Sequence, residues 1–455
     1  MEFVHHAYIP GETIAAVATP PGEGGIAVIR ISGESALAVA EKVYSGPIRS
    51  YKTHTAHFGK ILNAQGELVD EVLVLVMLGK RSYTGEDTVE IHCHGGSLVT
   101  KKVLETVLQA GARAAKPGEF TFKAFMSGKI DLTQAEAVQE LISAKSELAL
   151  NAAEKHLSGA LYQKISSFQK ELVDIAANIE AWVDFPEEDL EFESLENIIK
   201  FLKGLKQKMS ALSKTFHEGK IIKSGLSLCL AGAPNAGKSS LMNALLLKDR
   251  AIVTEIAGTT RDILEEDIRL GDLHFNLMDT AGIRDTEEII EKEGIKRSKK
   301  AIHEADLILL VMDVTKDVNQ ELLDSMPKER TVLVWNKTDL SFEKIPELHF
   351  PYAVSVSAKE GSGLQNLKDM IHQVIWQKGP PSKEEILITN LRHFSSLNNA
   401  IDSITCLIEG LENNVSPEFL SSDMRKTLFE LGSIIGTNIT EDILSAIFSK
   451  FCIGK

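Results

Sequence analysis

The chain has 455 residues and a formal net charge of −15, and 44% of its residues are hydrophobic. This composition excludes a disordered or fibrous chain, and the acidic balance argues against nucleic-acid binding through a globally basic surface. The length predicts about two to four domains. The four cysteines lie far apart and form no Cys-x-x-Cys pair, which favours reduced thiols in a cytoplasmic protein. We expect neither a secretory signal nor a membrane segment, because no basic start precedes an apolar run and all apolar runs are short.

Residues 1–120 mix short strand-like runs with glycine-rich turns, which is typical of a compact α+β domain. Their content of Ile and Val predicts strands over 25–32, 68–78 and 88–94. The spacing of apolar residues predicts helices over 35–44 and 97–111, and Gly111 is expected to close the second of them.

Helical spacing dominates residues 121–222 and 379–455, on either side of a segment of different character. From Thr133 onward apolar residues recur every three or four positions, which predicts one long helix with Thr133 and Glu136 as its capping box. Pro186 is expected to interrupt this helix before a second one follows. A long helix with one apolar stripe needs partners, so the two blocks are expected to pack together as one helical domain.

The middle segment, residues 223–378, alternates short apolar runs with helical stretches. The apolar runs cover 227–231, 274–279, 307–313, 331–336 and 352–357. Strands that are apolar on both faces and separated by helices predict a doubly wound, mainly parallel sheet. We therefore expect a multidomain α/β protein in which an α/β domain interrupts the helical domain.

A phosphate-binding loop is predicted after the first strand of this segment. Residues 232–239 read GAPNAGKS, which fits the pattern G-x-x-x-x-G-K-S, between a strand-like run and a helical one. The glycines let backbone N–H groups approach phosphates, and the N-terminus of the helix favours negative charge. Lys238 is expected to reach the β- and γ-phosphates, and Ser239 is expected to ligate magnesium.

Four further motifs follow in the order typical of a GTPase. They are AGTTRD (257–262), DTAG (279–282), NKTD (336–339) and SAK (357–359). Thr260 is expected to complete the magnesium shell, Asp279 to lie beside the ion, and the Gly282 amide to contact the γ-phosphate. Asp339 can accept two N–H bonds from the edge of guanine, which adenine does not offer, so the nucleotide is predicted to be a guanine one. The expected GTP contacts from these motifs and the loop are Asn235, Ala236, Gly237, Lys238, Ser239, Ser240, Ala257, Gly258, Thr259, Thr260, Asp279, Thr280, Ala281, Gly282, Asn336, Lys337, Asp339, Ser357, Ala358 and Lys359.

One position departs from many small GTPases. Ile283 follows DTAG, where those proteins place a glutamine that orients the attacking water. Either hydrolysis is slow or another group positions the water, and the charged stretch 284–294 supplies candidates.

With these motifs in place, the chain resembles the MnmE (TrmE) family of tRNA-modification GTPases over essentially its full length. The resemblance rests on ATPPGEGGIAVIRISG (18–33), SYTGEDTVEIHCHGG (82–96), KPGEFTFKAFMSGKIDLTQAEAV (116–138), the acidic turn DFPEE (184–188) and FCIGK (451–455). One departure is FKAF, where the family commonly has ERAF or KRAF. Lys123 keeps the positive charge, so we expect little change, although the bidentate chemistry of arginine is lost.

The resemblance implies that the GTPase domains dimerise across the nucleotide when potassium is present. Asn235 matches the family's potassium-ligating asparagine, and a second group matches the loop that closes over the ion. That group consists of Thr254, Ile256, acting through its backbone, and Thr259. Together with Glu255, the loop residues Thr254 and Ile256 join the expected GTP contacts. A monovalent cation beside the phosphates offsets the charge that develops there.

The resemblance also implies catalytic residues. Glu291 matches the family's glutamate that orients water indirectly, which would answer the problem posed by Ile283. Glu291 and Lys238 are therefore the expected catalytic residues of GTP hydrolysis. Cys452 matches the family's terminal cysteine, which has been thought to act as a nucleophile or to lie near the folate. The other interpretation of Cys452 is a buried structural thiol at a helix end.

The family's N-terminal domain binds formyl-tetrahydrofolate, the proposed one-carbon donor, at a dimer interface. The matching positions are Arg30, Glu90, Lys129 and Lys455. Their chemistry suits the ligand, because the anionic folate tail favours Arg or Lys and the pterin edge carries donors that suit a carboxylate. The alternative is that each of the four is an ordinary surface charge.

The function implied by the resemblance is that of a homodimeric GTPase. With a flavin-dependent MnmG (GidA)-type partner, in a heterotetramer, it would add a carboxymethylaminomethyl group to the wobble uridine of certain tRNAs. Two other classes stay open: a ribosome-assembly GTPase that binds rRNA, and a structural dimer whose GTPase is only regulatory. Residues 101–130 carry six basic and two acidic side chains, so the acidic charge of the chain is unevenly spread. The overall charge of −15 predicts that the partner holds much of the tRNA.

Overall fold

The computed structural model describes residues 9–184, 194–248, 267–278, 301–340, 348, 350–376, 379–382 and 384–455. The chain forms two compact units. One comprises residues 1–139, 155–207 and 396–455, and the other comprises residues 140–154 and 208–395. Within the described residues, no helix is both long enough and apolar enough to cross a membrane. The division into three domains with the boundaries given above stays a prediction.

The first unit contains a six-stranded sheet with the order β3-β4-β5-β2-β1-β6. The strands are β1 (Ile14–Val17), β2 (Ile26–Ser32), β3 (Thr55–Leu62), β4 (Leu68–Met77), β5 (Thr88–His94) and β6 (Arg113–Ala114). All pairings are antiparallel except that of β1 with β6. The helices α1 (Ala36–Val43) and α2 (Ser97–Gln109) accompany this sheet, and Gly111 follows α2 at a φ of 118°. The strands and helices expected here are therefore confirmed.

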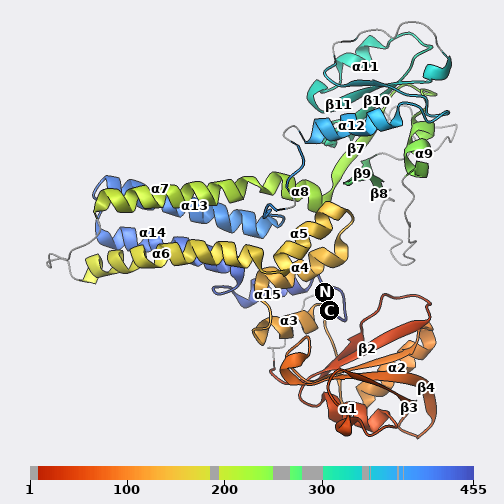
Figure 1. Ribbon diagram of the computed structural model, residues 1–455, viewed down its shortest axis with the longest axis vertical. Helices are drawn as coiled ribbons and strands as arrows, with labels where there is room; N and C mark the ends of the chain where they lie inside the picture. Colours follow the sequence, from red (N-terminus) through yellow and green to blue (C-terminus); the bar gives the residue numbers. More distant parts are fainter. Residues whose placement is uncertain are drawn as a thin grey trace. The chain divides into compact units, whose positions relative to one another are not determined.

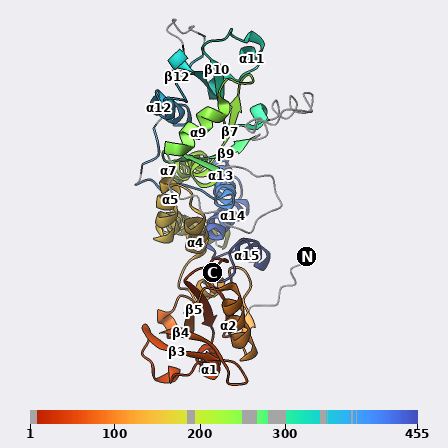
Figure 2. The same ribbon diagram turned by 90° about the vertical axis from the view of Figure 1, so that its right-hand side faces the viewer.

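The two faces of this sheet differ. The helices α1 and α2 lie against one face of this sheet (Figure 2). Alternate strand residues on that face, such as Ile29, Val74 and Ile91, are fully buried. The other face carries a row of facing residues in which Phe58 pairs with Leu73. Phe58 is 67% exposed and Leu73 is 48% exposed, so this face is apolar and open within the single chain.

The remaining helices of the first unit pack mainly on one another, and four of the helices below (α4, α5, α7 and α13) extend into the second unit. They are α3 (Glu119–Met126), α4 (Leu132–Ser143), α5 (Glu147–Leu157), α6 (Ala160–Asp184), α7 (Leu195–Lys214), α13 (Leu391–Glu412), α14 (Pro417–Ile435) and α15 (Glu441–Phe448). The helices α6 and α14 lie side by side (Figure 1). Arg425 of α14 donates two hydrogen bonds of 2.8 Å to the carboxylate of Glu180 on α6. Segments from the two ends of the helical sequence are thus brought together, as expected.

Two sequence predictions about this region are wrong. The long helix expected from Thr133 is divided into α4, α5 and α6, and Gly159, at a φ of 84°, separates the last two. The capping box is not formed by Thr133 and Glu136. Instead, Asp131 Oδ1 accepts from the Gln134 amide at 3.0 Å, and Gln134 Oε1 accepts from the Asp131 amide at 3.0 Å. This is the same reciprocal arrangement, begun two residues earlier.

The second unit contains another six-stranded sheet, ordered β12-β11-β10-β7-β9-β8. Its strands are β7 (Leu226–Ala231), β8 (Asp267–Leu270), β9 (Leu273–Met278), β10 (Leu307–Asp313), β11 (Thr331–Asn336) and β12 (Ala353–Ser355). Only the edge strand β8 is antiparallel among these pairs. Residues of α9 (Lys238–Lys248) and α12 (Leu364–Ile375) pack on one face, and Leu323 of α11 (Gln320–Asp324) packs on the other. A further helix, α8 (Phe216–Ser224), precedes β7. The predicted doubly wound, mainly parallel sheet is confirmed.

Candidate functional site: a nucleotide loop and an N-terminal ion cluster

The loop between β7 and α9 has the tight geometry that a phosphate-binding loop requires. Gly232 has a φ of 147°, and a Cβ atom there would lie 2.2 Å from the Val311 carbonyl oxygen. Gly237 has a φ of 96°, and a Cβ atom there would lie 2.2 Å from Asn336 Nδ2. Both positions therefore demand glycine for conformation and for space. The loop is held against the ends of two neighbouring strands of the sheet.

Lys238 begins α9 and turns back over the loop. Its ammonium donates to the carbonyl oxygens of Gly232 at 3.0 Å and Ala233 at 3.1 Å. This places a positive charge at the helix N-terminus, where backbone N–H groups already favour an anion. Ser239 and Ser240 follow in the first turn of the helix, so their hydroxyls lie at the same end.

The predicted base-binding motifs meet at the carboxyl end of β11. Asn336 is buried, and its Nδ2 donates to the Ala236 carbonyl at 3.0 Å, while its Oδ1 accepts from the Ala358 amide at 3.1 Å. Ser357 Oγ donates to Asp339 Oδ1 at 2.6 Å, which fixes the orientation of that carboxylate. The NKTD and SAK motifs therefore adjoin each other and the phosphate loop. Lys359, at the end of SAK, is exposed.

One member of this cluster was not predicted from the sequence. Asp313, the last residue of β10, accepts a 2.7 Å hydrogen bond from Lys337 of NKTD. Burial acts to raise the pKa of Asp313, but the Lys337 ammonium and the Thr315 hydroxyl and amide outweigh it and hold that pKa below its usual value. A carboxylate ending an otherwise apolar strand beside the NKTD strand is the signal that could have pointed to it.

Several predicted positions lie outside the described residues. They are Thr254, Glu255, Ile256, Ala257, Gly258, Thr259, Thr260, Asp279, Thr280, Ala281, Gly282, Ile283 and Glu291. Their assigned roles stay predictions.

The N-terminal candidate residues form a second cluster, in the first unit. Arg30 Nε donates to Glu90 Oε1 at 2.8 Å, directly across the β2–β5 pairing. Its Nη1 donates to the Gly454 carbonyl at 3.2 Å, which brings the FCIGK segment to the sheet. The rings of Tyr83 and Phe120 lie 5.9 and 5.6 Å from the guanidinium, within cation–π range. Neither ring nor the Gly454 carbonyl was singled out from the sequence.

Lys455 joins this cluster electrostatically. Burial lowers the pKa of its ammonium, the nearby Arg30 guanidinium lowers it further, and Glu90 opposes the shift. An added anion would relieve this repulsion between two cations, so the donor set fits a ligand with carboxylates. Lys129 is placed differently, because its ammonium donates to the carbonyl oxygens of Lys80 and Ser82. Cys452 is exposed, so the interpretation as a buried thiol is wrong.

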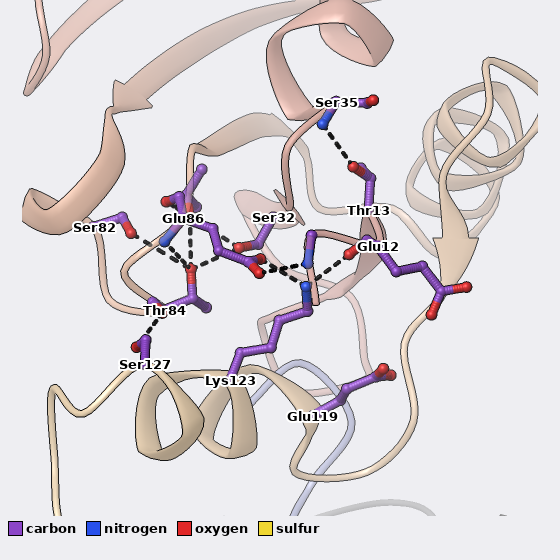
Figure 3. Close-up of polar contacts among 12 residues, drawn as sticks. Glu12, Thr13, Ser32, Ser35, Ser82, Thr84, Glu86, Glu119, Lys123 and Ser127 are labelled. Carbon is purple, nitrogen blue, oxygen red and sulfur yellow. Dashed lines mark hydrogen bonds and ion pairs between the residues drawn. The ribbon is translucent and has the colours of Figure 1, made fainter. Parts of the chain in front are cut away.

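The first unit also contains a buried lysine (Figure 3). Lys123 of α3 is 1% exposed, and its ammonium donates at 2.6 Å to both Glu86 Oε2 and the Glu12 carbonyl oxygen. The other oxygen of Glu86 accepts from the Gly11 amide at 3.3 Å. Lys123, the basic residue of FKAF, therefore forms a buried ion pair with Glu86. Its contacts with Glu86 and Glu12 connect α3 to two loops.

This burial changes the predicted basic stretch at residues 101–130. Lys123 is withdrawn from solvent, and Arg113 is engaged by the carboxylates of Glu12 and Glu119. These ion pairs raise the pKa of Arg113 and lower that of Glu12. The stretch thus offers fewer available positive charges than its composition suggests.

Comparison with known proteins shows full-length likeness. The family described as GTP-binding protein TrmE N-terminus matches residues 13–129, and the MnmE helical domain matches residues 132–452. The tRNA modification GTPase MnmE of Protochlamydia amoebophila is 63% identical over 458 residues and is matched over 100% of both chains. That of Alkaliphilus oremlandii is 40% identical over 457 residues, or 98% of this chain and 99% of the relative. Among solved structures, the G domain of the T. maritima FeoB iron transporter is 26% identical, with 33% of this chain and 98% of that chain covered and a TM-score of 0.24.

Proposed function

Because the chain belongs to the MnmE (TrmE) family of tRNA modification GTPases, we propose that it uses GTP to drive one specific reaction. With a flavin-dependent MnmG (GidA)-type partner it adds a carboxymethylaminomethyl group to the wobble uridine of certain tRNAs. The observation that carries the proposal is the pairing, in one chain, of a GTPase loop with the Arg30–Glu90–Lys455 cluster. A ribosome-assembly GTPase has no evident need of the second site.

The roles proposed at the nucleotide follow from the chemistry of each group. Lys238 neutralises charge on the β- and γ-phosphates, and Asp339 accepts the two N–H donors of guanine. The Ser239 hydroxyl, in the first turn of α9, has the oxygen-donor chemistry that Mg²⁺ prefers. When bound, Mg²⁺ would neutralise phosphate charge, and Thr260 and Glu291 complete the proposed site.

We expect GTP turnover to be at least about tenfold faster in potassium than in sodium, because a correctly seated cation stabilises phosphate charge. Asn235 has a φ of 62°, so Asn235→Gly removes the carboxamide while keeping the left-handed backbone. This variant should erase the difference between the two salts, and Asn197→Ala, at an exposed position of α7, should preserve it. Phosphate release measured in matched chloride salts gives both ratios, and equal wild-type rates would rule out the potassium assignment.

The proposed homodimer forms through the open face of the N-terminal sheet. Phe58 and Leu73 face each other on this face and are largely exposed, and Arg30 and Glu90 project from neighbouring strands. An exposed apolar patch beside an ion pair is suited to association with a second copy of the chain. The proposed formyl-tetrahydrofolate site lies at Arg30, Glu90 and Lys455, and the bound folate would supply the one-carbon unit.

Arg30→Gln should weaken tetrahydrofolate binding by the full-length protein at least about tenfold, because it removes a charge-assisted contact to the anionic tail. The matched control is Arg49→Gln, an exposed arginine of the same unit that pairs with Glu41. Isothermal titration gives both dissociation constants. Wild-type protein that binds no folate, or an Arg30→Gln variant that binds as tightly as the control, would refute the folate assignment.

A further inference from the structure

Asp313 lies where β10 ends, directly beside the residue that begins NKTD. In the parallel pairing of β10 with β11, Asp313 faces Asn336. Its side chain is 4% exposed, and both of its carboxylate oxygens accept hydrogen bonds. Oδ1 accepts from the Thr315 amide at 3.0 Å and from the Thr315 hydroxyl at 2.7 Å, and Oδ2 accepts from Lys337 Nζ at 2.7 Å. The carboxylate is therefore locked in one orientation.

Lys337 spans the gap between this carboxylate and the phosphate loop. Its ammonium also donates to the Asn235 carbonyl at 2.9 Å, and its backbone has a φ of 65°. Its Cε atom would lie 3.9 Å from a Cβ atom at Gly237, so the stem passes close to the loop. With both contacts made, the lysine side chain links the end of β10 to the phosphate loop.

A free lysine has much rotamer entropy to lose when it is ordered. The contact with Asp313 orders Lys337, and the lysine also ties the Asn235 carbonyl of the loop to the end of β10. A nucleotide that binds in this space would contact a lysine side chain that Asp313 orders, so its binding would cost less side-chain conformational entropy.

We propose that Asp313 is a positioning residue for the guanine nucleotide, acting only through Lys337. Asp313 holds the lysine stem beside the space for the guanine base. Through the same lysine it holds the Asn235 carbonyl in the loop conformation that binds phosphates. This inference rests on the proposed nucleotide site and adds a residue that none of the five GTPase motifs contains.

The test is a double-mutant cycle in the full-length chain, read as the dissociation rate of fluorescent mant-GDP. Asp313→Asn keeps the size and the capacity to accept from Thr315 but loses the charge, and it should speed dissociation about tenfold. Lys337→Met should speed it at least as much. In the Lys337→Met background, adding Asp313→Asn should change the rate less than about twofold, because its target is already gone.

Two further variants separate the role of Asp313 from a general effect of substitution near the site. Thr315→Val loosens Asp313 without removing it and should speed dissociation by about threefold, again only when Lys337 is present. Asp317→Asn, an exposed neighbour, should have no effect. Unchanged rates in both Asp313→Asn and Thr315→Val, or equal effects in the two Lys337 backgrounds, overturn the inference while leaving the nucleotide site intact. A wild-type chain that binds no mant-GDP would overturn the nucleotide site itself.

Discussion

Lys123→Met is expected to destabilise the N-terminal sheet by about 3–5 kcal/mol, the usual cost of removing one partner from a buried ion pair. The variant leaves the Glu86 carboxylate, 17% exposed, without its cation and the Glu12 carbonyl without its donor. The loss should appear as faster amide hydrogen exchange in β2 and β5, followed by mass spectrometry of the full chain, because this method reports the stability of one region.

The matched control for this prediction is Lys102→Met, which removes an exposed lysine from α2. It should leave exchange in both strands unchanged, within about 0.5 kcal/mol. Lys123→Arg tests the departure from the family pattern, because it restores the common residue while retaining charge. Exchange rates in Lys123→Met that match those of the Lys102→Met control would show that the buried pair contributes nothing.

Lys238→Ala is expected to lower kcat for GTP at least about 100-fold, the usual cost of removing one preorganised donor from developing charge. The ammonium lies over the loop through its contacts with the carbonyl oxygens of Gly232 and Ala233, at the end of α9 where phosphates are expected. Alanine favours the helix, so α9 should still form, and circular dichroism of the variant should match that of wild type. Steady-state phosphate release measures the effect.

Lys220→Ala, at an exposed position of α8, serves as the control and should retain wild-type turnover. A Lys238→Ala variant that keeps kcat within about threefold of the control would contradict the role given to this lysine.

Local signals predicted the GTPase core from sequence. Four of its five motifs, all but AGTTRD, directly follow a short apolar run, and parallel strands bring their carboxyl ends to one edge. Asn336 therefore contacts the phosphate loop, and Ser357 contacts Asp339, although 100 residues separate Asn336 from its partner Ala236. The antiparallel edge strand β8 was not predicted, because Asp267–Leu270 is too short to show alternation.

Other features were not predictable because they depend on tertiary contacts. The burial of Lys123 contradicts the usual exposure of lysine, and its partner Glu86 lies 37 residues away. The sequence offers two overlapping capping patterns for α4, one beginning at Asp131 and one at Thr133, and only the observed hydrogen bonds show that Asp131 caps the helix. The contact between Arg30 and the Gly454 carbonyl spans 424 residues, so no local pattern could indicate it.

We propose that this GTPase drives the modification of wobble uridine. The most direct test of this proposal expresses the chain in a bacterial strain that lacks its own family member and quantifies carboxymethylaminomethyl-uridine in tRNA by mass spectrometry. We predict that the wild-type chain restores the nucleoside and that Lys238→Ala, at equal expression, does not. Failure of the wild-type chain to restore the nucleoside, or equal restoration by Lys238→Ala, would contradict this proposed function.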